Sequence, residues 1–104
     1  MVQRADPIIT QFTQVVRKNI ISPRIILFGS RARGTASRTS DYDFAVISKS
    51  FTKLSPEKRS TKLYLLKQNI PAAMDILCYT PKEFERKKKT LGIVQEIVKD
   101  GKDV

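Results

Sequence analysis

A short apolar run that ends in a tight turn constrains this chain more than any other feature. Residues 25–28 are Ile-Ile-Leu-Phe, and Gly29 and Ser30 follow at once, which is the pattern of a buried strand entering a turn. Glycine lets a backbone approach a ligand closely, and the serine hydroxyl stands beside unpaired backbone N–H groups. A short helix beginning near Arg31 would point its positive dipole end at the same place. We therefore expect phosphate groups to be favoured at this turn.

Two aspartates precede a second apolar run. Asp41 and Asp43 stand directly before residues 44–47, Phe-Ala-Val-Ile, which predict another strand. Alternate residues of a strand project from the same face, about 6–7 Å apart, so the two carboxylates can converge. Like charges held that close repel unless a cation lies between them, and Mg²⁺ prefers such oxygen ligands. A Gly-Ser turn or an Asp-x-Asp pair is common by itself, but the ordered combination predicts a metal-assisted phosphate site.

A third carboxylate lies within a third apolar segment. Asp75 falls between Met74 and Ile76 in the strand predicted over residues 72–80. A carboxylate in such a run is costly to bury unless a cation or hydrogen bonds compensate it. Asp75 is therefore either an edge-strand residue or a third metal ligand beside Asp41 and Asp43.

The composition predicts one small, basic globular domain. A chain of 104 residues supports a single modest core, so we expect one domain over residues 1–104. The 20 Lys and Arg residues outnumber the 10 Asp and Glu residues, which gives a formal charge of +10. Such a surface attracts nucleotides, nucleic acid or an acidic protein partner, and the sign alone does not choose among them.

Several site classes are excluded by residue counts. The chain has no histidine and a single cysteine, Cys78, so a catalytic triad, a zinc cluster and a disulfide framework are ruled out. No segment approaches the roughly 18 apolar residues that a membrane span needs, so no membrane partner is expected. We expect a cytoplasmic protein, because cysteine usage fits a reducing compartment.

Helix signals alternate with the predicted strands. Helices are expected after Asp6-Pro7, Ser55-Pro56 and Thr80-Pro81. A last helix, suggested by apolar residues at 91, 93, 94, 97 and 98, is expected to end near Gly101. In the second helix, Leu63, Leu66 and Ile70 should face the core, and a basic face of Lys58, Arg59, Lys62 and Lys67 should face solvent. The pattern indicates an α/β (α+β) fold, with a small mixed sheet of three to four strands flanked by helices.

Basic residues near the turn are candidates for nucleotide binding. Arg31 and Arg33 flank the Gly-Ser turn, and Arg38 follows in a polar loop. Guanidinium groups match phosphate oxygens, and we expect Arg31 and Arg33 to contact the phosphates. The basic block 86–89 is expected to be a solvated helix face, so direct nucleic-acid binding stays open but is not favoured.

At Gly29, Ser30, Asp41 and Asp43 the chain resembles the minimal nucleotidyltransferases of the DNA polymerase beta superfamily. Their signature is Gly-Ser, about ten residues, then Asp-x-Asp, and the Arg-Ala-Arg-Gly stretch at residues 31–34 also resembles the family continuation. The resemblance implies the polymerase-beta-like nucleotidyltransferase fold, two Mg²⁺ ions and ATP as substrate. It further implies that Asp75 joins Asp41 and Asp43 as a catalytic metal ligand on the following strand.

The same resemblance implies a protein partner. Stand-alone members of the family are commonly antitoxins of modules whose toxin is a HEPN-type RNase, and they are thought to transfer AMP from ATP to a tyrosine of that toxin. We adopt this function as the leading hypothesis. Two alternatives remain: an antitoxin that neutralises its partner by binding only, and a nucleotidyltransferase that modifies a small molecule or an RNA end.

Overall fold

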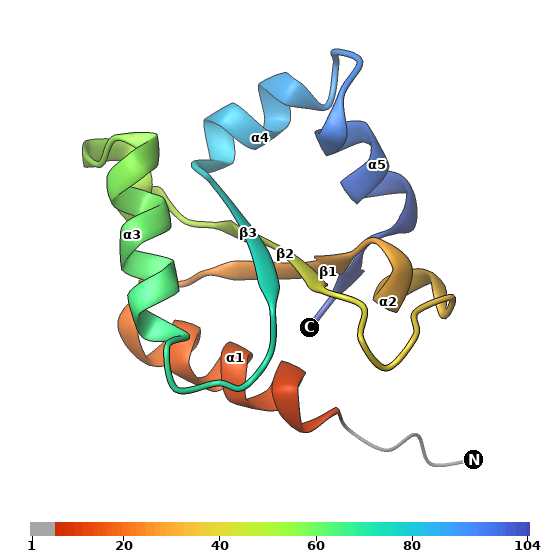
Figure 1. Cartoon of the computed structure of the whole chain (residues 1–104). Helices are drawn as coiled ribbons and strands as arrows, with labels where there is room; N and C mark the ends of the chain where they lie inside the picture. Colours follow the sequence, from red (N-terminus) through yellow and green to blue (C-terminus); the bar gives the residue numbers. More distant parts are fainter. Residues whose placement is uncertain (1–5) are drawn as a thin grey trace.

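The computed structural model describes residues 6–104. The helices are α1 (Pro7–Asn19), α2 (Ser30–Arg33), α3 (Pro56–Leu66), α4 (Pro81–Lys87) and α5 (Ile93–Asp100), with a 3-10 helix η1 (Lys49–Lys53). The strands are β1 (Arg24–Phe28), β2 (Tyr42–Ile47), β3 (Met74–Tyr79) and β4 (Lys102–Asp103). The predicted mixed sheet flanked by helices is thus confirmed (Figure 1).

The sheet has the order β3-β2-β1-β4. Strand β1 is antiparallel to β2 and to β4, whereas β2 is parallel to β3. A parallel neighbour requires a crossover connection, and α3 supplies it here. Strand β3 is consequently an edge strand, and its second residue is Asp75.

Helices cover both faces of the sheet because the central strands are apolar on both sides. Even-numbered residues of β2, such as Phe44, pack with α1 and α3 in one cluster that includes Phe12 and Leu63. On the opposite face, Phe28 and Ala45 pack with Phe84, Val94 and Ile97 of α4 and α5. Odd-numbered residues of β2 and β3 therefore face α4 and α5, which places Asp43 and Asp75 on that side of the sheet.

The three predicted helix starts are confirmed by cap hydrogen bonds. The Asp6 Oδ1 atom accepts from the Ile8 N–H at 2.8 Å, and the Ser55 hydroxyl accepts from the Lys58 N–H at 3.3 Å. Thr80 begins α4 with a reciprocal capping box, in which Glu83 also accepts from the Thr80 N–H at 2.8 Å. Each helix start depends on hydrogen bonds between residues only two to three positions apart.

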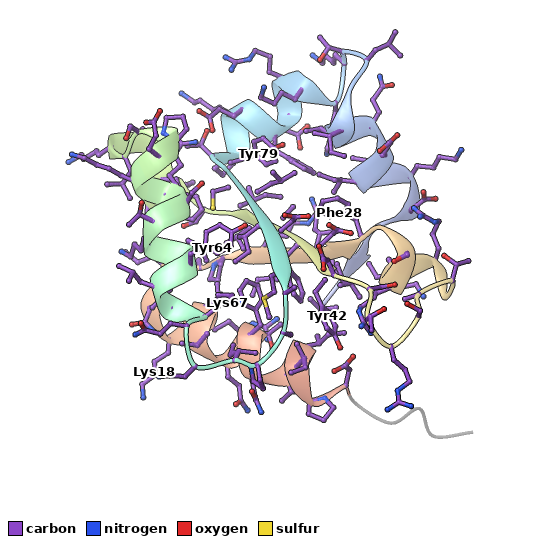
Figure 2. All side chains as sticks on the ribbon, in the orientation of Figure 1. Lys18, Phe28, Tyr42, Tyr64, Lys67 and Tyr79 are labelled. Atoms are coloured by element: carbon purple, nitrogen blue, oxygen red, sulfur yellow. The ribbon has the colours of Figure 1, made fainter. Side chains whose placement is uncertain are left out.

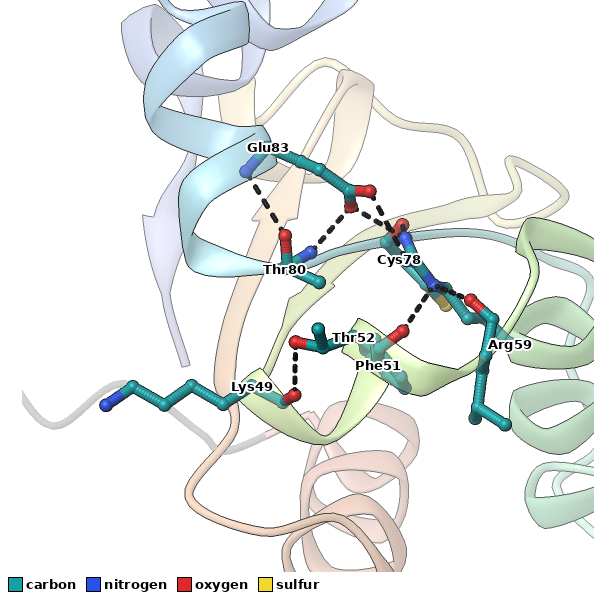
Figure 3. Close-up of polar contacts among 8 residues, drawn as sticks. Lys49, Phe51, Thr52, Arg59, Cys78, Thr80 and Glu83 are labelled. Atoms are coloured by element: carbon teal, nitrogen blue, oxygen red, sulfur yellow. Dashed lines mark hydrogen bonds and ion pairs between the residues drawn. The ribbon is translucent and has the colours of Figure 1, made fainter.

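The predicted basic solvent face of the second helix is wrong for Arg59. Its side chain is only 7% exposed and pairs with Glu83 at 2.7 Å, while its Nε donates to the carbonyls of Phe51 and Leu54 (Figure 3). The hydrogen bond from this guanidinium keeps the pKa of the Glu83 carboxyl group below its usual value. Arg59 therefore links α3, η1 and α4 across the core boundary.

The last helix differs from its prediction at Leu91. This residue is one of the apolar residues that predict the helix, yet it is 93% exposed and lies outside it. The helix begins later, at Ile93, so Leu91 lies in the connection before it. Gly101 ends α5 as expected, and the next two residues form β4, which pairs with Ile26 and Leu27 of β1. Within residues 6–104, every helix is too short or too polar to cross a bilayer.

Candidate active site

The turn after β1 forms one side of the site. Gly29 has φ of 74°, a left-handed value that favours glycine. The N–H groups of Ala32 and Arg33 both donate to the Gly29 carbonyl at 3.1 Å, so α2 is one short turn that begins at Ser30. Gly34 ends it, again with positive φ, and donates to the Ser30 carbonyl. The predicted strand, turn and short helix are all present.

Glycine at position 29 is required by its neighbour across the sheet. Phe28 pairs with Asp43 in the β1–β2 register, which brings residue 29 against the Asp43 side chain. A Cβ on residue 29 would overlap the Oδ2 atom of Asp43. The turn therefore holds backbone directly against a carboxylate, with no space for a larger residue.

Asp43 and Asp75 are direct neighbours in the parallel β2–β3 pairing. Both project toward the α4 and α5 side, where Asp43 is half-buried and Asp75 is exposed. Burial raises the pKa of Asp43, and the negative charges of Asp75 and Asp41 raise it further, against a smaller lowering by Arg33. The two adjacent carboxylates repel each other, and a divalent cation bound between them would relieve that repulsion.

Asp41 is exposed in the loop directly before β2. Its negative charge contributes to the raised pKa of Asp43. Among residues 6–104, no three carboxylate or other metal-binding side chains are close enough to form a ready-made metal site. The structure thus unites Asp43 with Asp75, and the joint ligand role of all three acids stays a prediction. The pair itself suits Mg²⁺, since it supplies hard oxygen ligands and leaves positions for water and phosphate.

An open cleft surrounds Asp43. A pocket of about 360 Å³ is lined on one side by Gly29, Ser30, Arg33 and Asp43, and on the other by α5. A second pocket of about 330 Å³ extends from Asp43 to Asp75. The two share Phe28, Asp43 and Ile93, so a ligand bound at the turn can reach the edge of β3.

The two candidate arginines separate in the structure. Arg33 lines the pocket at the turn, and its Nη1 lies 3.8 Å from Asp100 Oδ2. Arg31 does not line that pocket. Its Nη2 and Nε donate to the Ser40 carbonyl at 2.8 and 3.0 Å, and its Cζ lies 3.9 Å from the centroid of the Tyr42 ring. Its Nη2 also donates to the carbonyls of Ser37 and Arg38 at 3.4 Å, and a contact of Arg31 with phosphate stays a prediction.

The predictions from sequence missed the contributions of two helices, α5 and α3, to the cleft. Ile93, Glu96 and Asp100 of α5 line the pocket at the turn, and Tyr64 of α3 lines the pocket at Asp75. Figure 2 shows Tyr64 between α3 and β3. No motif marks these residues; the only signal was the amphipathic pattern of each helix, which does not reveal that one residue reaches a strand edge.

Comparisons with solved structures place this geometry among known folds. A chain from the crystal structure of a toxin-antitoxin with AMP-PNP is 25% identical, with a TM-score of 0.65 over 90% of this chain and 69% of that chain. A chain from a mutant of the toxin-antitoxin MntA-HpeT is 22% identical, with a TM-score of 0.65 over 97% and 72% of the two chains. BolA1 from Arabidopsis thaliana shares the fold at 18% identity and a TM-score of 0.57, covering 76% of this chain and 98% of its own.

Fold likeness alone does not identify the protein, since the similar folds include BolA1. No curated protein sequence matches the chain significantly. The family described as nucleotidyltransferase domain matches residues 9–104, which include the Gly29-Ser30 turn and all three aspartates. This match spans nearly the whole chain, and the protein therefore belongs to the nucleotidyltransferase domain family.

Proposed function

We propose that this protein is a Mg²⁺-dependent antitoxin that transfers AMP from ATP to a tyrosine of a HEPN-type toxin. The observation that carries the proposal is the placement of Asp43 between the Gly29 turn and Asp75, in one open cleft. This arrangement puts a phosphate-binding turn beside a pair of oxygen ligands. The family match over residues 9–104 supports nucleotidyl transfer as the reaction.

Each side chain of the cleft has a role in this reaction. The Ser30 hydroxyl and the N–H groups of the turn bind the β and γ phosphates, and Arg33 adds a guanidinium to the same pocket. Asp43 and Asp75, with Asp41, would hold Mg²⁺. When bound there, Mg²⁺ would offset the charge of the triphosphate and of the leaving pyrophosphate.

Proton transfer is assigned to Asp75. The acceptor hydroxyl oxygen attacks the α-phosphorus, the bond from that phosphorus to the bridging oxygen breaks, and pyrophosphate leaves with the electron pair. The hydroxyl proton passes to Asp75, which is exposed at the edge of the sheet and so is open to an incoming acceptor. Asp43, half-buried between turn and strand, keeps its place as a fixed ligand.

A separate chain is the best source of the acceptor. The cleft is open, and the pocket volumes of about 330–360 Å³ suit a nucleotide better than a nucleotide together with an acceptor. The similar chain that comes from a toxin-antitoxin crystal with AMP-PNP supports both an ATP-like ligand and a toxin partner.

The test combines this protein, the product of the adjacent reading frame, ATP and Mg²⁺, followed by intact mass measurement of both chains. We expect the partner to gain one or more AMP units, and Asp43→Asn to abolish the gain. A stable complex with no mass gain, and full neutralisation by Asp43→Asn, would instead show an antitoxin that acts by binding. A mass gain on an added RNA would indicate the remaining class of acceptor.

A further inference from the structure

The Tyr64 hydroxyl bonds to the backbone on both sides of Asp75. It donates to the Met74 carbonyl at 3.2 Å and accepts from the Ile76 N–H at 3.1 Å. Both groups lie on the outer edge of β3, where residues 6–104 supply no neighbouring strand. Tyr64 comes from α3, the crossover helix between β2 and β3, and Figure 2 shows it reaching toward β3. The Tyr64 hydroxyl thus makes the two backbone hydrogen bonds on either side of Asp75 that a neighbouring strand would otherwise make.

Asp75 needs such support more than any other residue of β3. Its backbone bonds to β2 on one side only, and its side chain faces the like charge of Asp43. Repulsion between the two carboxylates favours separation of the edge strand from β2 at this position. Two further hydrogen bonds at the outer edge oppose that separation.

The hydroxyl, rather than the ring, makes these contacts. Tyr64 is 39% exposed, whereas the neighbouring Leu63 is fully buried and supplies the packing of this turn of α3. A hydroxyl can donate and accept at once, which suits a carbonyl and an N–H that lie two residues apart. A phenylalanine would keep the same ring and lose both bonds.

We infer that Tyr64 is a positioning residue for the site, which holds the strand segment around Asp75 so that its carboxylate stays beside Asp43 to receive a divalent cation. This role rests on the proposed function, because it assigns Asp75 as a metal ligand and proton acceptor. Tyr64 itself stays bonded to backbone and acts through Asp75.

The test compares Tyr64→Phe with Tyr79→Phe. Tyr79 lies in β3 four residues after Asp75, away from the two aspartates, and loss of its hydroxyl is the matched control. Amide hydrogen exchange measured by NMR gives the first readout. We expect the Ile76 amide to exchange about tenfold faster in Tyr64→Phe and to keep its rate in Tyr79→Phe.

Mg²⁺ binding gives the second readout, and it does not depend on the acceptor. Backbone amide shifts are followed as Mg²⁺ is added in the presence of a non-hydrolysable ATP analogue. We expect Tyr64→Phe to weaken the Mg²⁺ dependence about tenfold and to leave nucleotide affinity without Mg²⁺ unchanged. In the transfer assay, kcat at fixed Mg²⁺ should fall with little change in the KM for ATP.

The outcomes separate this inference from the proposed function. If Tyr64→Phe speeds Ile76 exchange but leaves Mg²⁺ binding unchanged, the positioning role is overturned and Tyr64 only stabilises the edge of β3. Unchanged Ile76 exchange would overturn the inference as well. Failure of the wild-type protein to bind Mg²⁺ with nucleotide would overturn the proposed function, and the role of Tyr64 with it. Mg²⁺ binding without any transfer would leave the positioning role supported and the acceptor assignment rejected.

Discussion

The Cα atom of Gly29 faces the carboxylate of Asp43 so closely that a Cβ on residue 29 would overlap Asp43 Oδ2. The contact follows from the β1–β2 register, in which Phe28 pairs with Asp43. It joins the turn that we propose to bind phosphate to the carboxylate pair, so a side chain at residue 29 would displace the Asp43 carboxylate.

Gly29→Ala should therefore abolish nucleotide binding as well as reduce stability. The substitution places a side chain at φ of 74° and ψ of −159°, a conformation almost restricted to glycine, which costs about 1–3 kcal/mol in backbone strain. It also displaces the Asp43 carboxylate. Isothermal titration with ATP and chemical denaturation measure the two effects.

Gly34→Ala is the matched control. Gly34 has φ of 77° and ψ of 17°, the αL conformation, and among residues 6–104 nothing lies within 4 Å of a Cβ placed there. We expect a strain of about 1–2 kcal/mol, with nucleotide binding retained. Equal losses of binding in both variants would show that strain in α2, and not contact with Asp43, governs the turn.

Asp43→Asn should make the protein without Mg²⁺ more stable at neutral pH. The folded-state pKa of Asp43 is raised above its usual value by burial and by Asp75 and Asp41, so the folded state binds the proton more tightly than the unfolded state. Its contribution to stability is therefore greatest below the unfolded pKa of about 3.9, and it declines as pH rises through the folded pKa. Denaturation midpoints between pH 3 and 7 should show this decline in wild type and less of it in Asp43→Asn. A steeper decline in the variant would contradict the assignment.

Asp75→Asn should retain nucleotide binding and lose transfer. The amide keeps the size of the side chain but cannot accept the acceptor proton. Rates should fall by about 100-fold or more, measured as AMP incorporated into the partner. A fully active Asp75→Asn variant would reject both the general-base role and the three-carboxylate hypothesis.

Arg33→Ala and Arg31→Ala should give different defects. Arg33 lines the pocket at the turn, so its loss should weaken ATP binding about tenfold, more than any single alanine in the block 86–89. Arg31 holds the carbonyls of residues 37–40, so its loss should mainly lower the free energy of unfolding, by about 1–3 kcal/mol. Titration with ATP and denaturation of both variants decide this; a binding defect in Arg31→Ala at unchanged stability would restore its predicted phosphate contact.

Glu83→Gln should destabilise the fold by about 2 kcal/mol, because it leaves the Arg59 guanidinium, 7% exposed, without its anionic partner. The lowered pKa of Glu83 means that this stabilisation is present above the usual glutamate pKa and is lost as pH falls through the folded value. Glu85→Gln is the control, since its pair with Lys88 lies at the surface. Equal thermal shifts in the two variants would show that the Arg59 pair adds nothing beyond a surface contact.

Local chemistry made several features predictable from the sequence. The starts at Asp6-Pro7, Ser55-Pro56 and Thr80-Pro81 depend on bonds between residues two to three positions apart. The strand and turn at residues 25–30 depend only on an apolar run followed by glycine. Such patterns depend on few neighbours, and the structure confirms them.

Other features depended on pairing between distant segments. The basic pattern of the second helix predicted a solvated Arg59 and could not show that η1 and α4 supply its partners. Likewise, the sequence did not reveal that Arg31 donates to a carbonyl of the loop at residues 37–40. No motif marked Tyr64, because its contacts at the β3 edge lie 10 and 12 residues away.

The sequence by itself determined which groups are available to the site: a glycine turn, a serine hydroxyl and carboxylates at the entrances of apolar strands. Tertiary structure decided which of them meet. The parallel pairing of β2 with β3 sets Asp43 beside Asp75, and Asp41 remains in the preceding loop. A strand register is fixed by the packing of whole faces against helices, and no short motif contains that information.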